Sequence, residues 1–254
     1  MDALTLRTEP TGLDVAYYRH GQGEPLLFLH AILGLQGWEP VLDALSTSFD
    51  VIAPHTPGWG PSQDWDVLDG PLDIALFYDD FLQALGVNCA NVLGVSIGAW
   101  MAAELAAIFP HRVQKLILLN PLGIWLEAVP GEDPFAQHPM KPTEVLFSDP
   151  SLRERLLLQD QDKTEVYIRE THDLKAAAKF LWPIPDTGVR KRLPRISAPT
   201  QVVTSEHDAV VPPPYGRHWQ HAINGATLTT LPGVGHVATL EAPETCAQLA
   251  RDFF

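Results

Sequence analysis

Cysteine is nearly absent from this chain, with only Cys89 and Cys246 among its 254 residues. Two cysteines so far apart in sequence do not form the framework of a small disulfide-rich secreted protein, and a reduced protein is the default expectation. The N-terminal residues also lack the basic segment and long apolar run of a secretory signal peptide. We therefore expect a cytoplasmic protein.

Basic residues are also few, and no apolar run approaches the length of a membrane span. The chain has 17 Lys and Arg residues against 31 Asp and Glu residues, which gives a formal net charge of −14. A charge of this sign argues against nucleic acid and against anionic membrane surfaces as partners. The expected partner is a small-molecule substrate, and the sequence does not indicate the oligomeric state.

The sequence does contain enough apolar residues to bury a core, because 46% of its residues are hydrophobic. Short apolar runs typical of buried strands alternate with longer segments typical of amphipathic helices. This alternation predicts an α/β fold, with a mostly parallel sheet and helices on both faces. The expected strands are a hairpin over 3–20 and the runs 26–29, 50–54, 90–95, 113–119, 200–204 and 226–231, and the expected helices are 38–49, 71–85, 97–109 and 243–253.

The alternation is interrupted between the strand-like run that ends near Leu119 and the one that begins at Thr200. Proline and charged residues become frequent there, and segments such as 149–161 and 166–180 have the pattern of amphipathic helices. We interpret residues 123–195 as a helical cap inserted between two strands and lying over the strands' carboxyl ends. The core would then consist of residues 1–122 and 196–254.

One short stretch has the features of a catalytic turn. Gly94-Val95-Ser96-Ile97-Gly98 joins a strand-like apolar run to a segment rich in Ala, Leu and Met that is typical of a helix. Glycine at the second position on either side of the serine lets the strand end and the helix start approach closely. Such a turn exposes the Ser96 hydroxyl beside the unpaired N–H groups and the partial positive charge of a helix N-terminus.

This Gly-x-Ser-x-Gly turn resembles the nucleophile elbow of the α/β-hydrolase fold family. The resemblance implies a sheet of the eight-stranded type and a triad whose members follow along the chain in the order serine, acid, histidine. A serine hydroxyl needs a base within hydrogen-bond reach, and the base needs an orienting acid. Both partners are therefore expected on loops at the carboxyl ends of later strands.

Asp208 and His236 occupy the positions expected for the acid and the base. Asp208 closes a strand-like run, and Val210-Val211-Pro212 after it resembles the family's usual continuation, although Glu206 is a rival acid nearby. His236 follows the last expected strand in a Gly-x-Gly-His segment that resembles the family's histidine loop. We predict a catalytic triad of Ser96, His236 and Asp208.

The resemblance also implies two backbone donors for the oxyanion that forms when a carbonyl is attacked. One is the N–H of Ile97, directly after the serine, and the other is the N–H of Ile32, in the loop after the run 26–29. Ala31 stands where the family usually has glycine. A second family position for the acid, after the run 113–119, reads Asn120 and offers no carboxylate.

Aromatic and apolar residues of the predicted cap provide a lining for a binding pocket, as such pockets are mostly apolar. The candidates are Trp125 and Trp182, with Phe135, Leu146 and Phe180 as further apolar residues of the same segment.

No metal or cofactor site is predicted. His55 stands where many relatives have an acidic residue. No second metal ligand lies at ligand spacing from it, and we interpret its loop as structural. Arg169 has the chemistry to hold a substrate carboxylate, but Glu165 and Asp173 stand at helical spacing to pair with it, which is the simpler interpretation.

These features together predict a serine hydrolase that cleaves a carboxylic ester or lactone of a small, largely apolar substrate through an acyl-enzyme on Ser96. One alternative is carbon–carbon bond hydrolysis of ring-cleavage (meta-cleavage) products, which the size and cap of this chain also resemble. Those enzymes usually carry tryptophan after the histidine, whereas Val237 follows His236 here. Non-catalytic ligand binding and cofactor-free oxygenation on the same fold stay open as further alternatives.

Overall fold

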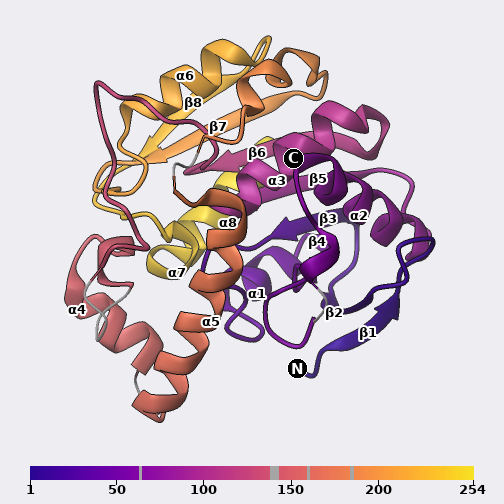
Figure 1. Ribbon diagram of the computed structural model, residues 1–254. Coiled ribbons are helices and arrows are strands. Elements are labelled where there is room, and N and C mark those ends of the chain that lie inside the picture. Colours follow the sequence, from indigo (N-terminus) through magenta and orange to yellow (C-terminus); the bar gives the residue numbers. More distant parts are fainter. Residues whose placement is uncertain (63–64, 138–142, 159–160, 184–185) are drawn as a thin grey trace.

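A single twisted sheet organises the chain, and the computed structural model describes all residues except 63–64, 138–142, 159–160 and 184–185. The sheet has eight strands in the order β1-β2-β4-β3-β5-β6-β7-β8 (Figure 1). The strands are β1 (Leu4–Arg7), β2 (Asp14–His20), β3 (Glu24–Leu29), β4 (Phe49–Pro54), β5 (Ala90–Val95), β6 (Val113–Leu119), β7 (Thr200–Ser205) and β8 (Thr227–Leu231).

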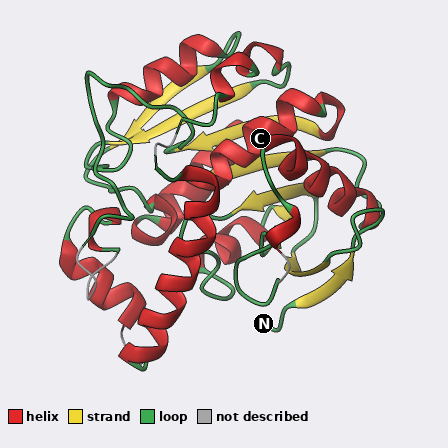
Figure 2. Cartoon of the chain, viewed as in Figure 1, coloured by secondary structure: helices red, strands yellow, loops and turns green. Residues whose placement is uncertain are grey.

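Strand directions follow the prediction from the sequence. β1 and β2 form an antiparallel hairpin, β2 is antiparallel to β4, and the other neighbouring strands are parallel. Every residue of the central strand β5 is buried, as expected for a strand that is covered on both faces. The predicted fold class, a mostly parallel α/β sheet with helices on both faces, is confirmed (Figure 2).

The helices form two layers around the sheet. α1 and α8 pack together on one face, and α2 and α3 pack together on the other. Within the described part of the chain, no helix is long and apolar enough to cross a membrane. The helices are α1 (Pro40–Ser46), α2 (Pro71–Ala84), α3 (Ile97–Ile108), α4 (Pro150–Arg153), α5 (Lys163–Leu181), α6 (Pro214–Ala222), α7 (Ala238–Glu241) and α8 (Pro243–Phe253).

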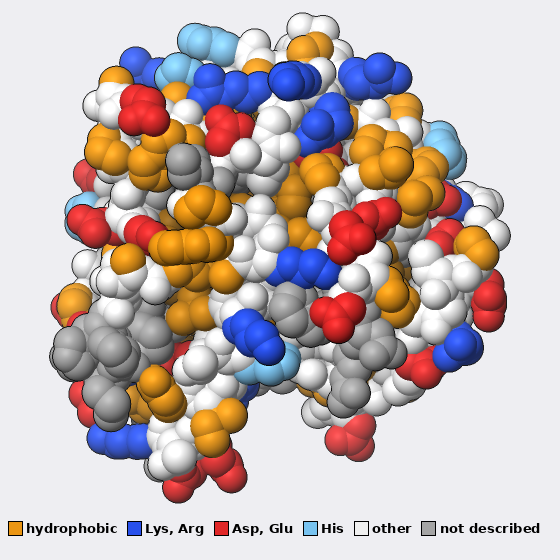
Figure 3. Space-filling model, viewed as in Figure 1, with side chains coloured by type: hydrophobic (Ala, Val, Ile, Leu, Met, Phe, Trp, Pro, Cys, Tyr) orange, Lys and Arg blue, Asp and Glu red, His pale blue; other side chains and the backbone are white. Residues whose placement is uncertain are grey.

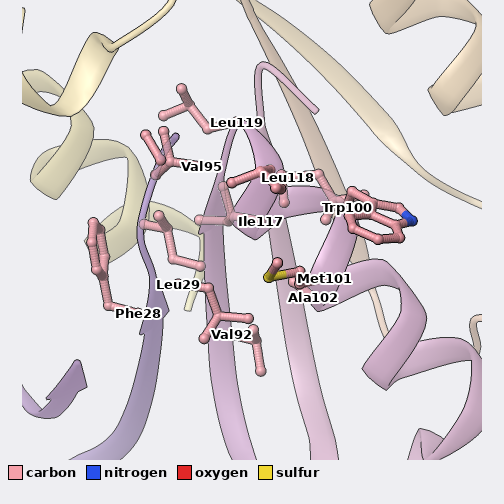
Figure 4. Packing of buried hydrophobic residues seen from close by; sticks show 14 of the residues in the cluster. Phe28, Leu29, Val92, Val95, Trp100, Met101, Ala102, Ile117, Leu118 and Leu119 are labelled. Carbon is pink, nitrogen blue, oxygen red and sulfur yellow. The ribbon is translucent and has the colours of Figure 1, made fainter. Parts of the chain in front are cut away.

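The core lies between the central strands and these helix layers. In Figure 4, Phe28 of β3 points toward the C-terminal helices, while Met101 of α3 packs on the opposite side of the sheet. Phe28 and Met101 are each 1% exposed, so both sides of the sheet are sealed from water. This packing fixes the carboxyl ends of β5, β6 and β7, from which the predicted site residues emerge.

The segment 123–195 leaves the sheet after β6 and returns to it before β7, and we call it the insertion. The sequence predicts a helix over 149–161, but the structure has the short α4 followed by a π-helical turn, Glu154–Leu158. Inside the insertion, Arg153 forms a buried ion pair with Glu170 and also donates to the Thr143 hydroxyl. In Figure 1, α4 and α5 project beyond the sheet at the lower left.

Two contacts attach the insertion to α3, the helix behind the predicted nucleophile. Arg192 donates two hydrogen bonds to the carboxylate of Glu104, which is fully buried on α3. The indole of Trp100 donates to the same carboxylate at 2.8 Å, and its ring contacts Phe180 of α5. The insertion and the serine-bearing helix are thus linked through one buried acid.

Glycine at position 98 allows the closest approach between α3 and β3. A Cβ atom on Gly98 would lie 2.4 Å from the carbonyl oxygens of both Leu29 and His30, and these backbone atoms cannot rotate away. We predict that Gly98→Ala lowers the free energy of unfolding by about 3 kcal/mol, measured by urea denaturation, because it overpacks the junction.

The matched control is Gly70→Ala. Gly70 has an extended backbone with φ −172° and has nothing within 4 Å of its Cβ position. Gly70 is also the N-cap of α2, where alanine is less favourable than glycine, so we expect this control to lower stability by at most about 1 kcal/mol. Equal effects at the two positions would show that the close approach at Gly98 has no special energetic role.

Candidate active site

Ser96 occupies a strained turn between β5 and α3. Its backbone has φ 60° and ψ −120°, a conformation that non-glycine residues rarely adopt. Backbone hydrogen bonds over-determine this conformation, because the Ser96 N–H donates to the Leu119 carbonyl at 2.8 Å and the Ser96 carbonyl accepts from Leu122 at 3.2 Å. The end of β6 therefore holds the serine at the start of α3.

Three side chains from separate strand ends meet at this turn. The Ser96 hydroxyl lies 2.7 Å from Nε2 of His236, and Nδ1 of His236 lies 2.8 Å from Oδ2 of Asp208. Because a carboxylate only accepts, Nδ1 carries the proton and Nε2 is free to accept from the serine O–H. Sequence reasoning named these three residues, and the structure brings them into one hydrogen-bonded row.

The orientation of Asp208 is fixed by the backbone that follows it. Its Oδ1 accepts from the amides of Val210 at 2.9 Å and Val211 at 2.8 Å, which leaves Oδ2 directed at the histidine. The rival acid, Glu206, instead accepts from the Gly233 amide at 2.8 Å, near the surface. The two carboxylates thus support the same histidine loop in different ways.

The row is shielded from water. Ser96 and His236 are 0% exposed and Asp208 is 4% exposed, with the insertion packed against the loops that carry them. Hydrogen bonds in such an environment are stronger than in water because the local dielectric constant is low. The same burial means that the Ser96 hydroxyl is closed to solvent in this conformation.

Asn120 holds the histidine loop in place, a role that sequence reasoning did not foresee. Its side-chain amide donates to the His236 carbonyl at 2.9 Å, to the Gly235 carbonyl at 3.3 Å and to the Ser205 hydroxyl at 2.9 Å. Asn120 has φ 48°, a left-handed conformation that asparagine tolerates better than most residues. The sequence showed only that this position lacks a carboxylate.

Glu241 joins the histidine loop to the insertion. Its carboxylate accepts from the amide and the hydroxyl of Ser148 and, at 3.3 Å, from the Gly235 amide. Next to it, the Val237 amide donates to the carbonyl of Leu146 at 3.2 Å. Leu146 was a candidate for the pocket lining, and the structure instead buries it at this junction.

The amides of Ile32 and Ile97, the predicted oxyanion donors, lie in fully buried residues. In the described parts of the chain neither amide donates to a protein acceptor, so both keep a free N–H. For Ile97 this follows from its position as the first residue of α3, where helical amides have no internal partner.

The Ile32 N–H and the Ala31 carbonyl belong to the same planar peptide group. Hydrogen bonds to that carbonyl therefore also set the direction of the N–H. The Ala31 carbonyl accepts from Nδ1 of His30 at 2.8 Å and from the Gly34 amide at 3.0 Å. Because the peptide group is planar and trans, the Ile32 N–H points away from these donors. The indole of Trp59 fixes the next peptide by donating to the Ile32 carbonyl at 3.0 Å.

His30 is locked in one tautomer. Its Nε2 accepts from the Thr56 amide at 3.1 Å while its Nδ1 donates, and burial lowers the pKa of His30 to about 3. His55, on the same loop as Thr56, is also buried, and desolvation lowers its pKa to about 4. Both imidazoles are therefore neutral structural groups at neutral pH, in line with the interpretation of the His55 loop as structural.

A cavity opens beside the serine turn, between the insertion and the core. Trp125 and Phe135 line it, as the sequence suggested for cap aromatics. Trp182 does not line it, since its side chain is 56% exposed and packs edge-on against Phe135. In Figure 3, hydrophobic side chains gather to the left of α5, with acidic side chains beside them.

Asp173 lies apart from this cavity, where α5 packs over the loop that carries Ile32. A Cβ atom added to Gly34 would lie 3.5 Å from Oδ2 of Asp173, and Asp173 is 3% exposed. Burial raises the pKa of Asp173 to about 8, an effect that the charge of Arg169 partly offsets. Arg169 lies beside Asp173 in a shallow cleft and donates to Gln161, and neither residue lines the cavity beside the serine turn.

The fold is that of an α/β hydrolase. A family model described as "alpha/beta hydrolase fold" matches residues 24–243. The chain belongs to this family.

Two curated relatives illustrate the range of similar proteins. One is the dihydrolipoyllysine-residue acetyltransferase component of the acetoin cleaving system of Cupriavidus necator. The two sequences are 30% identical over 240 residues, and the alignment covers 91% of this chain. The chain spans only 63% of that protein's length. It is 29% identical over 268 residues to the 2-hydroxy-6-oxo-6-phenylhexa-2,4-dienoate hydrolase of Comamonas testosteroni, covering 94% of this chain and 90% of the relative.

Solved structures show the same fold at lower identity. A meta-cleavage product hydrolase from Pseudomonas fluorescens superposes with a TM-score of 0.81 at 18% identity, over 99% of this chain and 97% of that one. An enol-lactonase from Burkholderia xenovorans superposes with a TM-score of 0.76 at 21% identity, over 98% of this chain and 99% of that one.

Asp173 leads to a pH prediction. The folded protein holds a proton on this carboxyl up to about pH 8, whereas the unfolded chain releases it near pH 4. Stability is therefore lost as pH rises through this window, because the unfolded state binds fewer protons. We predict that Asp173→Asn is more stable than the wild type at pH 7.5 by up to about 5 kcal/mol, at about 1.4 kcal/mol per pH unit, and that the difference shrinks toward pH 4.5.

Urea denaturation at a series of pH values measures this difference. Glu165→Gln, an exposed substitution on the same helix, is the control and should change stability by less than about 0.5 kcal/mol at every pH. A difference between Asp173→Asn and wild type that stays constant from pH 4.5 to 7.5 would contradict the assignment.

Proposed function

We propose that this protein is a serine hydrolase that cleaves a carboxylic ester or lactone of a small, largely apolar substrate. The observation that carries the proposal is the hydrogen-bonded row from the Ser96 hydroxyl through His236 to Asp208. A serine held against an imidazole that a carboxylate orients is the arrangement required for nucleophilic acyl transfer.

In the first half of the reaction, the Ser96 hydroxyl attacks the substrate carbonyl while Nε2 of His236 takes its proton. Asp208 holds the imidazole and stabilises the imidazolium that forms. The free N–H groups of Ile32 and Ile97 receive the negative charge on the former carbonyl oxygen. His236 then gives the proton to the leaving alkoxide, and an acyl ester remains on Ser96.

In the second half, a water molecule attacks the acyl ester, and His236 acts as its base. The tetrahedral intermediate collapses, the proton returns to the Ser96 oxygen, and the carboxylic acid leaves. A buried site favours both halves, because fixed N–H donors act more strongly where water is excluded. In this proposal the insertion acts as a cap that opens for the substrate and closes over it.

A second candidate is carbon–carbon bond hydrolysis, which the names of the similar proteins favour. Several relatives at 24–29% identity are called hydrolases of 2-hydroxy-6-oxo-dienoates or related compounds. The printed sequence has Val237 after His236, where such enzymes usually have tryptophan. Turnover of 2-hydroxy-6-oxo-6-phenylhexa-2,4-dienoate at least about tenfold faster than p-nitrophenyl esters of any chain length would favour this candidate over the ester hydrolase.

Labelling with a fluorophosphonate probe distinguishes an enzyme from a non-catalytic binder. We predict that the wild type is labelled covalently and that Ser96→Ala is not, because only an activated serine attacks the probe. Ser62→Ala is the matched control, since Ser62 is also buried but its hydroxyl accepts from the Ala16 amide, away from the site. Labelling of Ser96→Ala at the wild-type rate would rule out Ser96 as the nucleophile.

Trp59→Phe tests whether the loop of Ile32 supplies an oxyanion donor. The variant removes the indole N–H that fixes the Ile32 carbonyl while keeping most of the apolar bulk. We predict that kcat for a p-nitrophenyl ester falls about tenfold while KM stays within about twofold, because the donor acts mainly on the transition state.

The control for this variant is Trp219→Phe, on α6. Trp219 is equally buried, but its indole N–H has no partner among the described residues, so its loss should leave kcat unchanged. Equal losses of kcat in the two variants would mean that the indole hydrogen bond of Trp59 has no role in the reaction.

A further inference from the structure

The walls of the cavity beside the serine turn are apolar except for two acidic side chains. Glu132 and Asp133 are the charged residues that the structure places on its wall. The rest of the described lining is aromatic, aliphatic or proline: Leu122, Trp125, Pro134, Phe135, Leu181, Pro183 and Val210. A ligand in this cavity would therefore meet apolar surface and negative charge.

The cavity adjoins the proposed catalytic row. Leu122, on its wall, donates its amide to the Ser96 carbonyl at 3.2 Å, and Val210, on the same wall, donates its amide to Asp208 at 2.9 Å. Two residues of the lining are thus bonded directly to the serine turn and to the acid. Ser96 and His236 are not on the described lining themselves, so the cavity would receive the part of a substrate that lies beyond the reacting carbonyl.

The acidic pair is held firmly against the loop that carries Asp208. The Glu132 amide donates to the Ala209 carbonyl at 2.8 Å. A Cβ on Gly131, the residue before it, would lie 2.0 Å from the carbonyl oxygen of Val210, so only glycine permits this close contact. Oδ1 of Asp133 accepts from the Phe135 amide at 2.8 Å, which fixes the turn that carries both acids.

We infer that Glu132 and Asp133 select for substrates with an uncharged apolar group in this cavity and against substrates with a carboxylate there. The inference rests on the proposed function, which places the reacting carbonyl at Ser96. A carboxylate entering the cavity would lose its hydration against apolar walls and would also be repelled by two negative charges. Glu132 is exposed and Asp133 is half-buried, so solvent weakens their fields. At roughly 6 Å one such repulsion reduces binding roughly threefold in water and about a hundredfold at an effective dielectric constant of about 20, and we expect about tenfold for this partly exposed pair.

This selectivity separates the chain from several proteins that it resembles. The similar hydrolases are named for substrates that are dienoates, dienedioates or trienedioates, all of which carry at least one carboxylate. The cavity of this chain lacks the charge complementarity that such a group would need on the walls described here. The substrate of this protein is therefore a neutral ester or lactone with an apolar acyl chain.

The experiment compares two esters that differ only at the end of the acyl chain. p-Nitrophenyl hexanoate ends in a methyl group, and the mono-p-nitrophenyl ester of adipic acid has the same length but ends in a carboxylate. With Ser96→Ala as the blank for spontaneous hydrolysis, we expect kcat/KM of the wild type to be at least about tenfold higher for the hexanoate. Equal rates, or a preference for the adipate ester, would overturn the inference.

The double variant Glu132→Gln, Asp133→Asn assigns the effect to these residues and keeps the acceptor for the Phe135 amide. We expect it to raise kcat/KM for the adipate ester about tenfold and to leave the hexanoate within about twofold. Glu127→Gln, an exposed neutralisation on the same segment outside the cavity, is the control and should leave the ratio unchanged. An unchanged ratio in the double variant would also overturn the inference.

A binding measurement separates this inference from the proposed function. Ser96→Ala is titrated with hexanamide and with adipamate, the monoamide of adipic acid, which carries its carboxylate at the far end of the chain, while tryptophan fluorescence, to which Trp125 contributes, is recorded. We expect hexanamide to bind at least about tenfold more tightly, and the double variant to remove the difference. If the wild type cleaves neither ester but this discrimination holds, the proposed hydrolysis is wrong and the selectivity stands. If the two ligands bind equally, the selectivity is wrong.

Discussion

The hydrogen bond between the Ser96 hydroxyl and Nε2 of His236, 2.7 Å long, is the interaction on which the rest of the site depends. It joins residues 140 positions apart in the chain, so it can form only if the ends of the central strands are held in register. Complete burial of β5 and the close approach of Gly98 to β3 provide that rigidity. The strained backbone of Ser96 is maintained by the same framework.

The loops around the row are held by side chains that take no direct part in the proposed chemistry. Asn120 fixes the histidine loop through its backbone carbonyls, and Glu241 ties the same loop to the insertion. His30 and Trp59 hold the carbonyls of the loop that carries Ile32. Each of these side chains orients a peptide group. In the loop that carries Ile32, this orientation also sets the direction of the free Ile32 N–H. The site is thus built from backbone geometry as much as from the three reactive side chains.

Much of this arrangement could be predicted from the sequence, because the signals were local. The glycines at 94 and 98, and the strand-like runs before Asp208 and His236, each identify a turn without knowledge of the fold. The roles of Asn120 and Trp59 could not be predicted, because their partners lie far away in the chain. The exposed position of Trp182 and the break after α4 depend on packing within the insertion, which has no strong periodic pattern. The strands were predictable because they have apolar runs, as in β5, or alternate apolar with polar residues, as in β1, whereas the insertion has neither pattern throughout.

The central claim, that Ser96 becomes acylated, is tested most directly by mass spectrometry of protein quenched in acid within milliseconds of mixing with p-nitrophenyl hexanoate. His236 is proposed to activate both the Ser96 hydroxyl and the attacking water. Acylation and deacylation of Ser96 should therefore both require His236. The account predicts a hexanoyl adduct on the peptide that contains Ser96 in the wild type and its absence in His236→Ala. Rapid hydrolysis of the ester with the adduct on another residue, or with no adduct at any time, would contradict it.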